Sequence, residues 1–267
     1  LLDTTRAYAL EKLHAGGEYP DAARREAKYY CGFFANAEAD SEVKPQAEWL
    51  TIYGRHIDNV RTSLDWAFSS GGDAQVGAAL TAAAVPLWVQ LSLLSECRER
   101  TELALARLDP TAANAPRLRM QLSAARGWSL MYGVGRAREA GPAWAATLQL
   151  AEQLGDRDYL LRALWGLCID QFNNGEFRRA LEFAHRFADA VADSGNPVDR
   201  MMADRLLATT LHYLGDQRQA YHHIGRTLSR LSDLAAKPQV IRFRFDLRAS
   251  ARYFQARILW LLGLADQ

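Results

Sequence analysis

The sequence predicts an all-α fold, a solenoid of antiparallel helix pairs that repeats about every 40 residues. The first observation is a turn pattern, a Gly followed five residues later by an Ala, which occurs three times at this interval: Gly135 and Ala140, Gly175 and Ala180, Gly215 and Ala220. The second is another pair of turn glycines, Gly155 and Gly195, at the same spacing. Because one helix pair cannot bury its apolar face alone, neighbouring pairs must stack on one another.

Helices of uneven length are expected in the first part of the chain. Their apolar residues recur at three-to-four-residue spacing, and glycines or prolines separate the segments. The first segment ends at Gly16, and the later ones cover 21–39, the stretch from Pro45 to the glycines at 71–72, 74–91 and 96–108. The last two are expected to form an antiparallel pair.

Regular helix pairs are expected from Pro116 onward. They cover 117–133 with 137–154, 157–173 with 177–194, and 199–214 with 217–235, and a last helix covers about 239–262. The short loops between these segments suit antiparallel neighbours. Residues 241–247 alternate between apolar and charged side chains as an edge strand would, but the apolar residues that follow continue at helical spacing, which favours a helix.

Composition excludes several classes of protein. About half of the 267 residues are hydrophobic, and the formal net charge is only +1, so this segment lacks the concentrated basic field that DNA contact requires. No apolar run is long enough to span a membrane and no signal peptide opens the chain, so a cytoplasmic protein is expected. Cys31, Cys97 and Cys168 lie far apart, which favours buried thiols over disulfides or a metal site.

Catalytic motifs are missing from the sequence. There is no G-x-x-x-x-G-K-[ST] phosphate loop, and the pair Gly133 and Gly135 lacks the third glycine of a dinucleotide-binding fingerprint. Gly127-Trp128-Ser129 starts like a nucleophile elbow, but Met131 stands where a second glycine is required. The histidines do not have the H-E-x-x-H spacing of a zinc site. No enzyme activity, cofactor or metal is therefore expected in this segment.

Several segments resemble a known family. The helix pairs resemble tetratricopeptide units, lengthened from the usual period of about 34 residues. Residues 1–13 look like the last helix of the winged-helix segment that ends the NB-ARC-type nucleotide-binding module of bacterial signal-transduction ATPases with tandem repeats. Residues 56–67 are similar to the H-D-N-L-R-A-A-L-x-W-A helix that follows this module, and residues 212–217 and 256–263 resemble the repeat region.

The resemblance implies a domain organisation. Residues 1–18 would end an upstream winged-helix and ATPase module, 19–110 would form irregular helical hairpins, and 111–267 would be tetratricopeptide-like repeats with turn glycines at 135, 175, 215 and 263. The last repeat is expected to be cut short at the C-terminus.

The same resemblance implies a function. In this family a DNA-binding domain commonly precedes the ATPase, and the repeats act as a sensor or regulatory arm. The expected partners are therefore the chain's own upstream ATPase and DNA-binding domains, together with an unknown signal ligand or protein. The alternative is a docking scaffold for protein–protein interaction that binds a peptide in its concave groove.

The concave groove of such repeats gives candidate binding residues. Positions three, six, ten and thirteen residues before each turn Gly are expected to face it. The candidates are Tyr132, Arg162, Trp165, Phe172, Arg205, His212, Tyr253, Arg257 and Trp260, with Ser129, Ile169 and Thr209 beside them. Arginines and aromatic rings suit a partner with anionic and apolar parts. Aromatic residues at helical spacing are, however, more often part of a core.

A second candidate surface lies on the last helix. Arg244, Arg248 and Arg252 follow one another at four-residue spacing, so they share one helix face. This face could receive an acidic partner surface, including the ATPase module, or it could simply be solvated.

Overall fold

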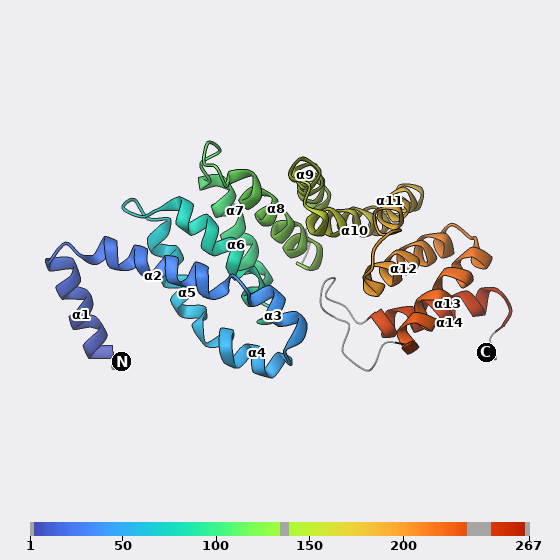
Figure 1. Ribbon diagram of the computed structural model, residues 1–267, viewed down its shortest axis with the longest axis horizontal. Helices are drawn as coiled ribbons and strands as arrows, with labels where there is room; N and C mark the ends of the chain where they lie inside the picture. The colour runs from blue at the N-terminus through green and yellow to red at the C-terminus, as the bar shows by residue number, and fades with distance from the viewer. Residues whose placement is uncertain (1–2, 134–138, 234–246, 265–267) are drawn as a thin grey trace. The chain divides into compact units, whose positions relative to one another are not determined.

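The protein is helical throughout the part that the structure describes. The computed structural model describes residues 3–133, 139–233 and 247–264, and within these ranges it contains helices and connecting turns but no β-strand (Figure 1). The chain divides into two compact units, Leu1–Ser129 (unit 1) and Leu130–Gln267 (unit 2), and the division falls within one helix, α8 (Ala115–Tyr132). The all-α prediction is confirmed. The expected boundary at residue 110 lies in the loop before α8, whereas the compact units divide near the end of that helix.

Unit 1 is built from helices of uneven length. It contains α1 (Asp3–Ala15), α2 (Tyr19–Phe34), α3 (Ala37–Val43), α4 (Gln46–Tyr53), the 3-10 turn η1 (Gly54–His56), α5 (Ile57–Ala67), α6 (Ala74–Gln90), α7 (Leu94–Arg107) and most of α8. Its core is aromatic and aliphatic, with Trp49, Trp88, Leu64 and Leu87 fully buried. The expected pair over 74–91 and 96–108 is present as α6 and α7, which pack against each other.

Two helices that were expected to be continuous are broken. The stretch 21–39 forms α2 and α3, because Gly32 and Asn36 are poor helix formers and the last turn of α2 tightens, with the N–H of Ala35 donating to the carbonyl of Gly32 (3.2 Å). The stretch that starts at Pro45 is interrupted by η1 at Gly54, because glycine has no side chain and disfavours the interior of a helix. The side chain of Trp49 donates to the carbonyl oxygen of Ala37 (2.8 Å) and so joins α4 to α3.

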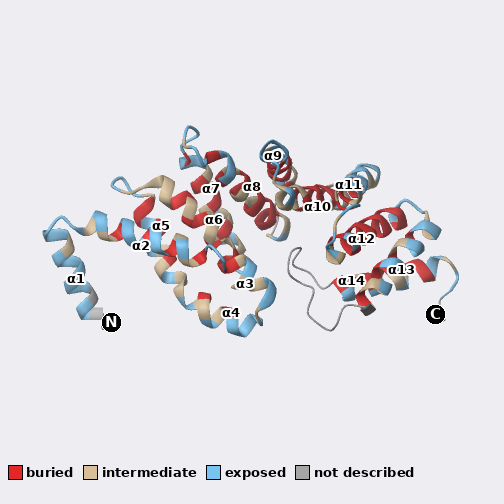
Figure 2. Ribbon diagram, viewed as in Figure 1, coloured by how far each residue is buried: buried red, intermediate tan, exposed pale blue. Residues whose placement is uncertain are grey.

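Unit 2 has the regular pattern that the repeats predict. After the end of α8 come α9 (Ala140–Leu154), α10 (Arg157–Asn173), α11 (Phe177–Ala190), α12 (Pro197–Tyr213), α13 (Gln217–Asp233) and α14 (Leu247–Leu261). From α9 to α14 each helix packs against the next, and α12 also contacts both α10 and α14. First helices of successive pairs therefore lie beside one another, as in a helical solenoid. Figure 2 shows that α12, in the middle, is buried along most of its length.

The turns follow the repeat with one exception. Gly175, Gly215 and Gly263 have φ values of 81°, 90° and 75°, the left-handed conformation that ends a helix at low cost only for glycine. Gly155 also lies in this region, with φ of 64°, but Gly195, its counterpart one repeat later, does not. There α11 ends at Ala190, four residues earlier than expected, and the Asn196 side chain caps α12 instead, accepting from the N–H of Val198 (2.9 Å). Gly135 lies outside the described residues.

The small residues of the repeat lie at helix contacts. Ala180 and Ala220 are both completely buried, as the pattern predicts. The thiol of Cys168, in α10, reaches the carbonyl oxygen of Ala180, in α11, at 3.3 Å, so the two backbones approach closely. Burial raises the pKa of this thiol to about 12, as expected for an inert buried cysteine.

The described part of the expected last helix is α14, Leu247–Leu261. The strand-like alternation over 241–246 and Arg244 of the basic stripe lie outside the described residues. No helix that the structure describes combines the length and the apolar character needed to cross a bilayer.

Candidate functional site

The nine candidate residues of unit 2 differ widely in exposure. Trp165, Arg205 and His212 are buried, and Arg162, Phe172 and Arg257 are half-buried. Tyr132, Tyr253 and Trp260 are exposed, and Trp260 is the most exposed of the nine, at 72%. The repeat register places them at equivalent positions of successive helices, but only some of them can meet a ligand.

Trp165 is a core residue, which corrects the expectation of an exposed stacking surface. Its exposed fraction is 1%, and its ring meets that of Trp144, from α9, edge to face with centroids 6.3 Å apart. Such a pair contributes packing energy in addition to its buried area. The side chain of Trp165 therefore holds α10 against α9.

Arg205 links two helices from within the fold. Its Nε donates to the hydroxyl of Ser250 in α14 (2.9 Å), and its guanidinium lies 6.0 Å from the ring centre of Phe254. Burial lowers the pKa of Arg205 to about 10, which still leaves the group charged at neutral pH. At 9% exposure it is a structural cation, and not the accessible ligand contact that the sequence suggested.

His212 lies at the edge of a pocket with its ring orientation fixed. Its Nδ1 lies 2.8 Å from the side-chain oxygen of Gln217, whose amide nitrogen in turn donates to the carbonyl oxygen of His212 (2.8 Å). This reciprocal pair places the hydrogen of the neutral imidazole on Nδ1. Gln217 thus orients the ring across the turn that connects α12 to α13.

Four of the candidate residues line one pocket. It has a volume of about 380 Å³ and lies between α12 and α14, and we call it the Arg257 pocket. Its lining consists of His212, Tyr253, Ala256, Arg257, Trp260 and Leu261. About two turns of α14 supply Tyr253, Arg257 and Trp260, two aromatic rings and a cation, at the positions that the register predicted.

Arg257 is held between two tyrosines. Its Nη1 donates to the hydroxyls of Tyr253 (2.8 Å) and Tyr213 (3.0 Å), and the guanidinium lies 5.5 and 5.2 Å from the centres of these rings. The hydrogen bond to Tyr253 is the main reason why the pKa of Arg257 is raised. Within the described ranges, no residue bonds its Nε or Nη2, so one edge of the guanidinium remains available for a carboxylate.

Tyr213 is a functional candidate that the sequence did not reveal. Its ring stacks on Phe177 (5.1 Å) and meets Phe172 edge to face (4.8 Å), while its hydroxyl reaches Arg257. The register selected positions three and six residues before the turn Gly, and Tyr213 stands two residues before Gly215. Phe172 consequently supports the pocket through Tyr213 and does not line it.

The remaining candidates lie apart from the Arg257 pocket. Arg162 forms an ion pair with Asp158 one turn earlier on α10 (2.7 Å) and stacks over Tyr159. Tyr132 is about half exposed near the end of α8 and does not line the pocket. Among the residues that the structure describes, no group of three His, Cys, Asp or Glu side chains could hold a metal ion.

Neither a protein-family model nor a curated protein sequence matches this chain.

Proposed function

We propose that this chain is a partner-binding helical-repeat module, and that it acts as the sensor and regulatory arm of a multidomain ATP-dependent transcriptional regulator. The observation that carries the binding role is the Arg257 pocket, where a positioned guanidinium lies beside exposed aromatic and apolar side chains. The regulatory role rests on the resemblance of residues 1–13 and 56–67 to signal-transduction ATPases.

The chemistry of the pocket favours a ligand with an anionic group next to an apolar one. Trp260 and Leu261 are 72% and 60% exposed, so a partner that covers them would remove a large apolar area from water. Arg257 offers a planar fork to a carboxylate, and the tyrosines fix its position before binding. A peptide segment with an acidic residue beside an aromatic or leucine side chain meets both requirements.

Selection of peptides from a displayed random library tests the binding role. Peptides enriched on the wild-type chain should combine an acidic and an apolar residue. Their affinity should fall on the order of 5- to 100-fold for Trp260→Ala or Arg257→Ala, the usual loss for a central interface residue. Tyr221→Ala is the matched control, because Tyr221 is an exposed aromatic residue of unit 2 outside the pocket. Selected peptides that bind all three variants equally would place recognition elsewhere.

A measurement on the full-length protein separates the regulator from the docking scaffold. The chain itself encodes no phosphate loop, so it should not bind ATP by calorimetry. In the full-length protein, a selected peptide should change the rate of ATP hydrolysis, and Arg257→Ala should remove that change. Tight peptide binding without any effect on hydrolysis would favour a scaffold.

A further inference from the structure

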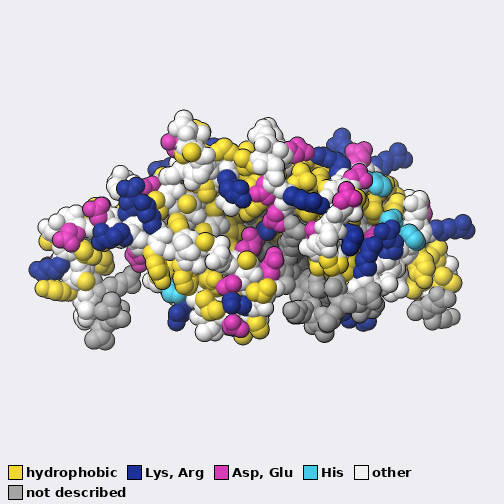
Figure 3. Space-filling view, viewed as in Figure 1, with side chains coloured by type: hydrophobic (Ala, Val, Ile, Leu, Met, Phe, Trp, Pro, Cys, Tyr) yellow, Lys and Arg dark blue, Asp and Glu magenta, His cyan; other side chains and the backbone are white. Residues whose placement is uncertain are grey.

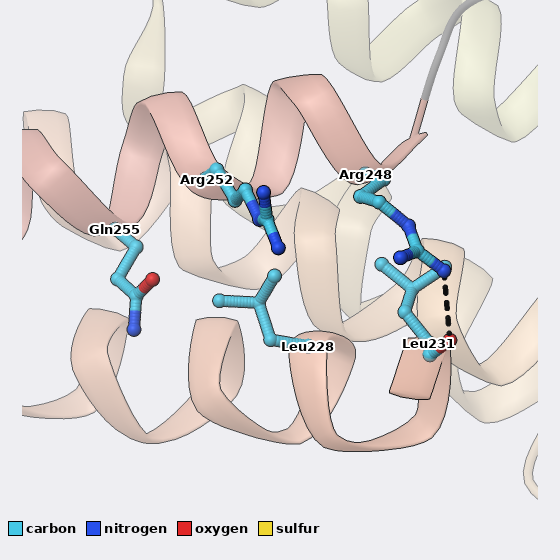
Figure 4. A pocket seen from close by; sticks show the side chains of 5 residues that line it. All are labelled: Leu228, Leu231, Arg248, Arg252 and Gln255. Carbon is cyan, nitrogen blue, oxygen red and sulfur yellow. Dashed lines mark hydrogen bonds between the residues drawn. The ribbon is translucent and has the colours of Figure 1, made fainter. Parts of the chain in front are cut away.

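A second concave surface lies on the other side of α14, between α13 and α14. It has a volume of about 240 Å³ and is lined by Leu228, Leu231, Arg248, Arg252 and Gln255, and we call it the Arg252 groove. Figure 4 shows the two arginines extending from α14 over the two leucines of α13. None of these residues lines the Arg257 pocket, so the two surfaces are distinct.

Positive charge is concentrated on α14. This helix carries Arg248, Arg252 and Arg257 and no Asp or Glu, in a chain whose formal net charge is only +1. Arg252 is exposed and makes no ion pair with any residue in the described ranges. By contrast, Arg226 and Arg230 of α13 are both paired with the buried carboxylate of Asp204. Basic side chains gather over α12 and α13 in Figure 3, and in the groove itself the charge of Arg252 lacks an acidic neighbour among the described residues.

Arg248 is positioned by the end of the neighbouring helix. Its Nη2 donates to the carbonyl oxygen of Leu231 in the last turn of α13 (3.2 Å), one of the terminal carbonyls that have no partner within their own helix. A cation is favourable at this end of a helix. The guanidinium therefore stands at a defined place, one helical turn from Arg252 on the same face of α14.

The floor of the groove is apolar and recessed. Leu231 is 3% exposed and Leu228 is half-buried, so neither side chain protrudes from the surface. A bilayer surface would need protruding apolar side chains to insert. A nucleic acid would need a longer basic track than two arginines. An acidic protein segment that places one apolar side chain on the leucines fits both the size and the charge of the groove.

We propose that the Arg252 groove binds an acidic helical segment of a partner protein, with two carboxylates four residues apart that pair with Arg248 and Arg252. The spacing of the two carboxylates then equals the spacing of the two arginines, one turn of helix in each case. A leucine-sized side chain on the same face of the segment contacts Leu228 and Leu231. This site is independent of the Arg257 pocket and of the role proposed for it.

The test uses labelled helical peptides of about 20 residues, a length that forms a stable helix in an Ala-rich sequence. One peptide carries Glu at two positions four apart with a Leu on the same face, a second carries Gln at these positions, and a third carries Lys. Fluorescence anisotropy with the complete chain should rank Glu above Gln and Gln above Lys. Arg252→Ala should weaken binding of the Glu peptide by about two- to fivefold, as for one exposed ion pair.

Charge reversal makes the test sharper. The Arg252→Glu variant should invert the order, so that it binds the Lys peptide better than the Glu peptide. Arg218→Ala is the matched control, because Arg218 is an exposed arginine of α13 outside the groove. The comparison is repeated in a Trp260→Ala background, where the Arg257 pocket is impaired. There Arg252→Ala should still cause the same fold loss for the Glu peptide, which separates this site from the Arg257 pocket.

Three outcomes would overturn the proposal. The first is equal binding of the Glu and Gln peptides. The second is a loss of binding in Arg218→Ala as large as that in Arg252→Ala, because both results would indicate unspecific attraction. The third is Arg252-dependent binding of phosphatidylserine-containing vesicles or of single-stranded RNA that is tighter than binding of the Glu peptide, which would assign the groove to another class of partner.

Discussion

Equivalent positions of successive repeats have very different environments. Trp165, Arg205 and Tyr253 each stand ten residues before a turn glycine, yet their exposed fractions are 1%, 9% and 55%. Three residues before the turn, Phe172 is half-buried, His212 is 4% exposed and Trp260 is 72% exposed. The repeat register fixes the face of the helix on which a residue lies, and the neighbouring helices decide whether that face is covered.

The packing order explains the difference. Helix α12 contacts α10, α11, α13 and α14, so a side chain on nearly any face of α12 meets another helix. Helix α14 packs against α12 and α13, and its residues Tyr253, Trp260 and Leu261 keep large exposed fractions. The same sequence position therefore stabilises the fold in α10 and leaves an exposed side chain in α14.

Truncation of the two aromatic residues at equivalent positions gives the largest expected contrast. Trp165→Ala should lower the free energy of unfolding by about 3–5 kcal/mol, because it removes a fully buried ring and leaves a cavity. Tyr253→Ala should change it by less than about 1 kcal/mol, because the ring is more than half exposed. Urea denaturation followed by circular dichroism measures both. Similar losses in the two variants would show that the position in the repeat, and not its burial by neighbouring helices, determines the free energy of unfolding that the side chain contributes.

The position nine residues before each turn glycine shows how side-chain volume is shared between neighbouring helices. Gly166, Leu206 and Phe254 are equivalent, and the side chains at matching positions of the preceding helices are Trp144, Ala184 and Ile224. A Cβ atom added to Gly166 would lie 2.3 Å from the Trp144 ring. Trp144 is the largest of the three facing side chains, and it leaves room only for a glycine. We expect Gly166→Leu to destabilise the protein by at least about 1–3 kcal/mol through overpacking.

Combining that change with Trp144→Ala copies the second repeat into the first. The double variant should be more stable than the sum of the two single losses predicts, because the leucine fills space that the indole vacates. Ala249→Leu, an added side chain of the same size at an exposed position of α14, is the control. If the losses in free energy of unfolding of the two single variants simply add in the double variant, the leucine does not fill the space left by the indole, and the proposed compensation between these positions is wrong.

The smallest expected effect concerns pH. Asp170 of α10 is buried at a position where the later repeats have Thr210 and Ile258, and burial raises the pKa of its carboxyl group. The folded state therefore holds this proton more tightly than the unfolded state, and the stability from the neutral carboxyl is lost as pH rises through the folded pKa. Asp170→Asn keeps an oxygen for the N–H of Gly141 and removes the titration. Between about pH 3.5 and 7, its stability relative to wild type should rise. A constant difference over this range would contradict the assigned burial.

Much of the fold could be predicted from the sequence because it depends on local signals. The turn glycines 175, 215 and 263 need a left-handed backbone, and the alanines after two of these turns lie where helices touch. The breaks at Asn36 and Gly54 were missed, because apolar spacing continues across them and only a tightened turn marks the end of each helix. The resemblance to a family of ATPases remains a proposal.

The candidate site could be predicted only in part. The register identified His212, Tyr253, Arg257 and Trp260, which share one pocket, since these positions depend on helical geometry. It gave Trp165 and Arg205 the same role, because the sequence does not state how many helices surround a given face. Tyr213 escaped notice because its role depends on a hydroxyl that reaches a residue 44 positions away.

The distribution of tryptophans gives the protein two separate optical signals. Six of its seven indoles, Trp49, Trp66, Trp88, Trp128, Trp144 and Trp165, are at most 8% exposed, and Trp260 in the Arg257 pocket is 72% exposed. Emission from the six shielded indoles should move to longer wavelength only when the chain unfolds. A soluble quencher such as acrylamide should reach Trp260 alone in the native state. Protection of this quenchable fraction by an added compound would then report occupancy of the pocket directly, without a label and without interference from changes in stability.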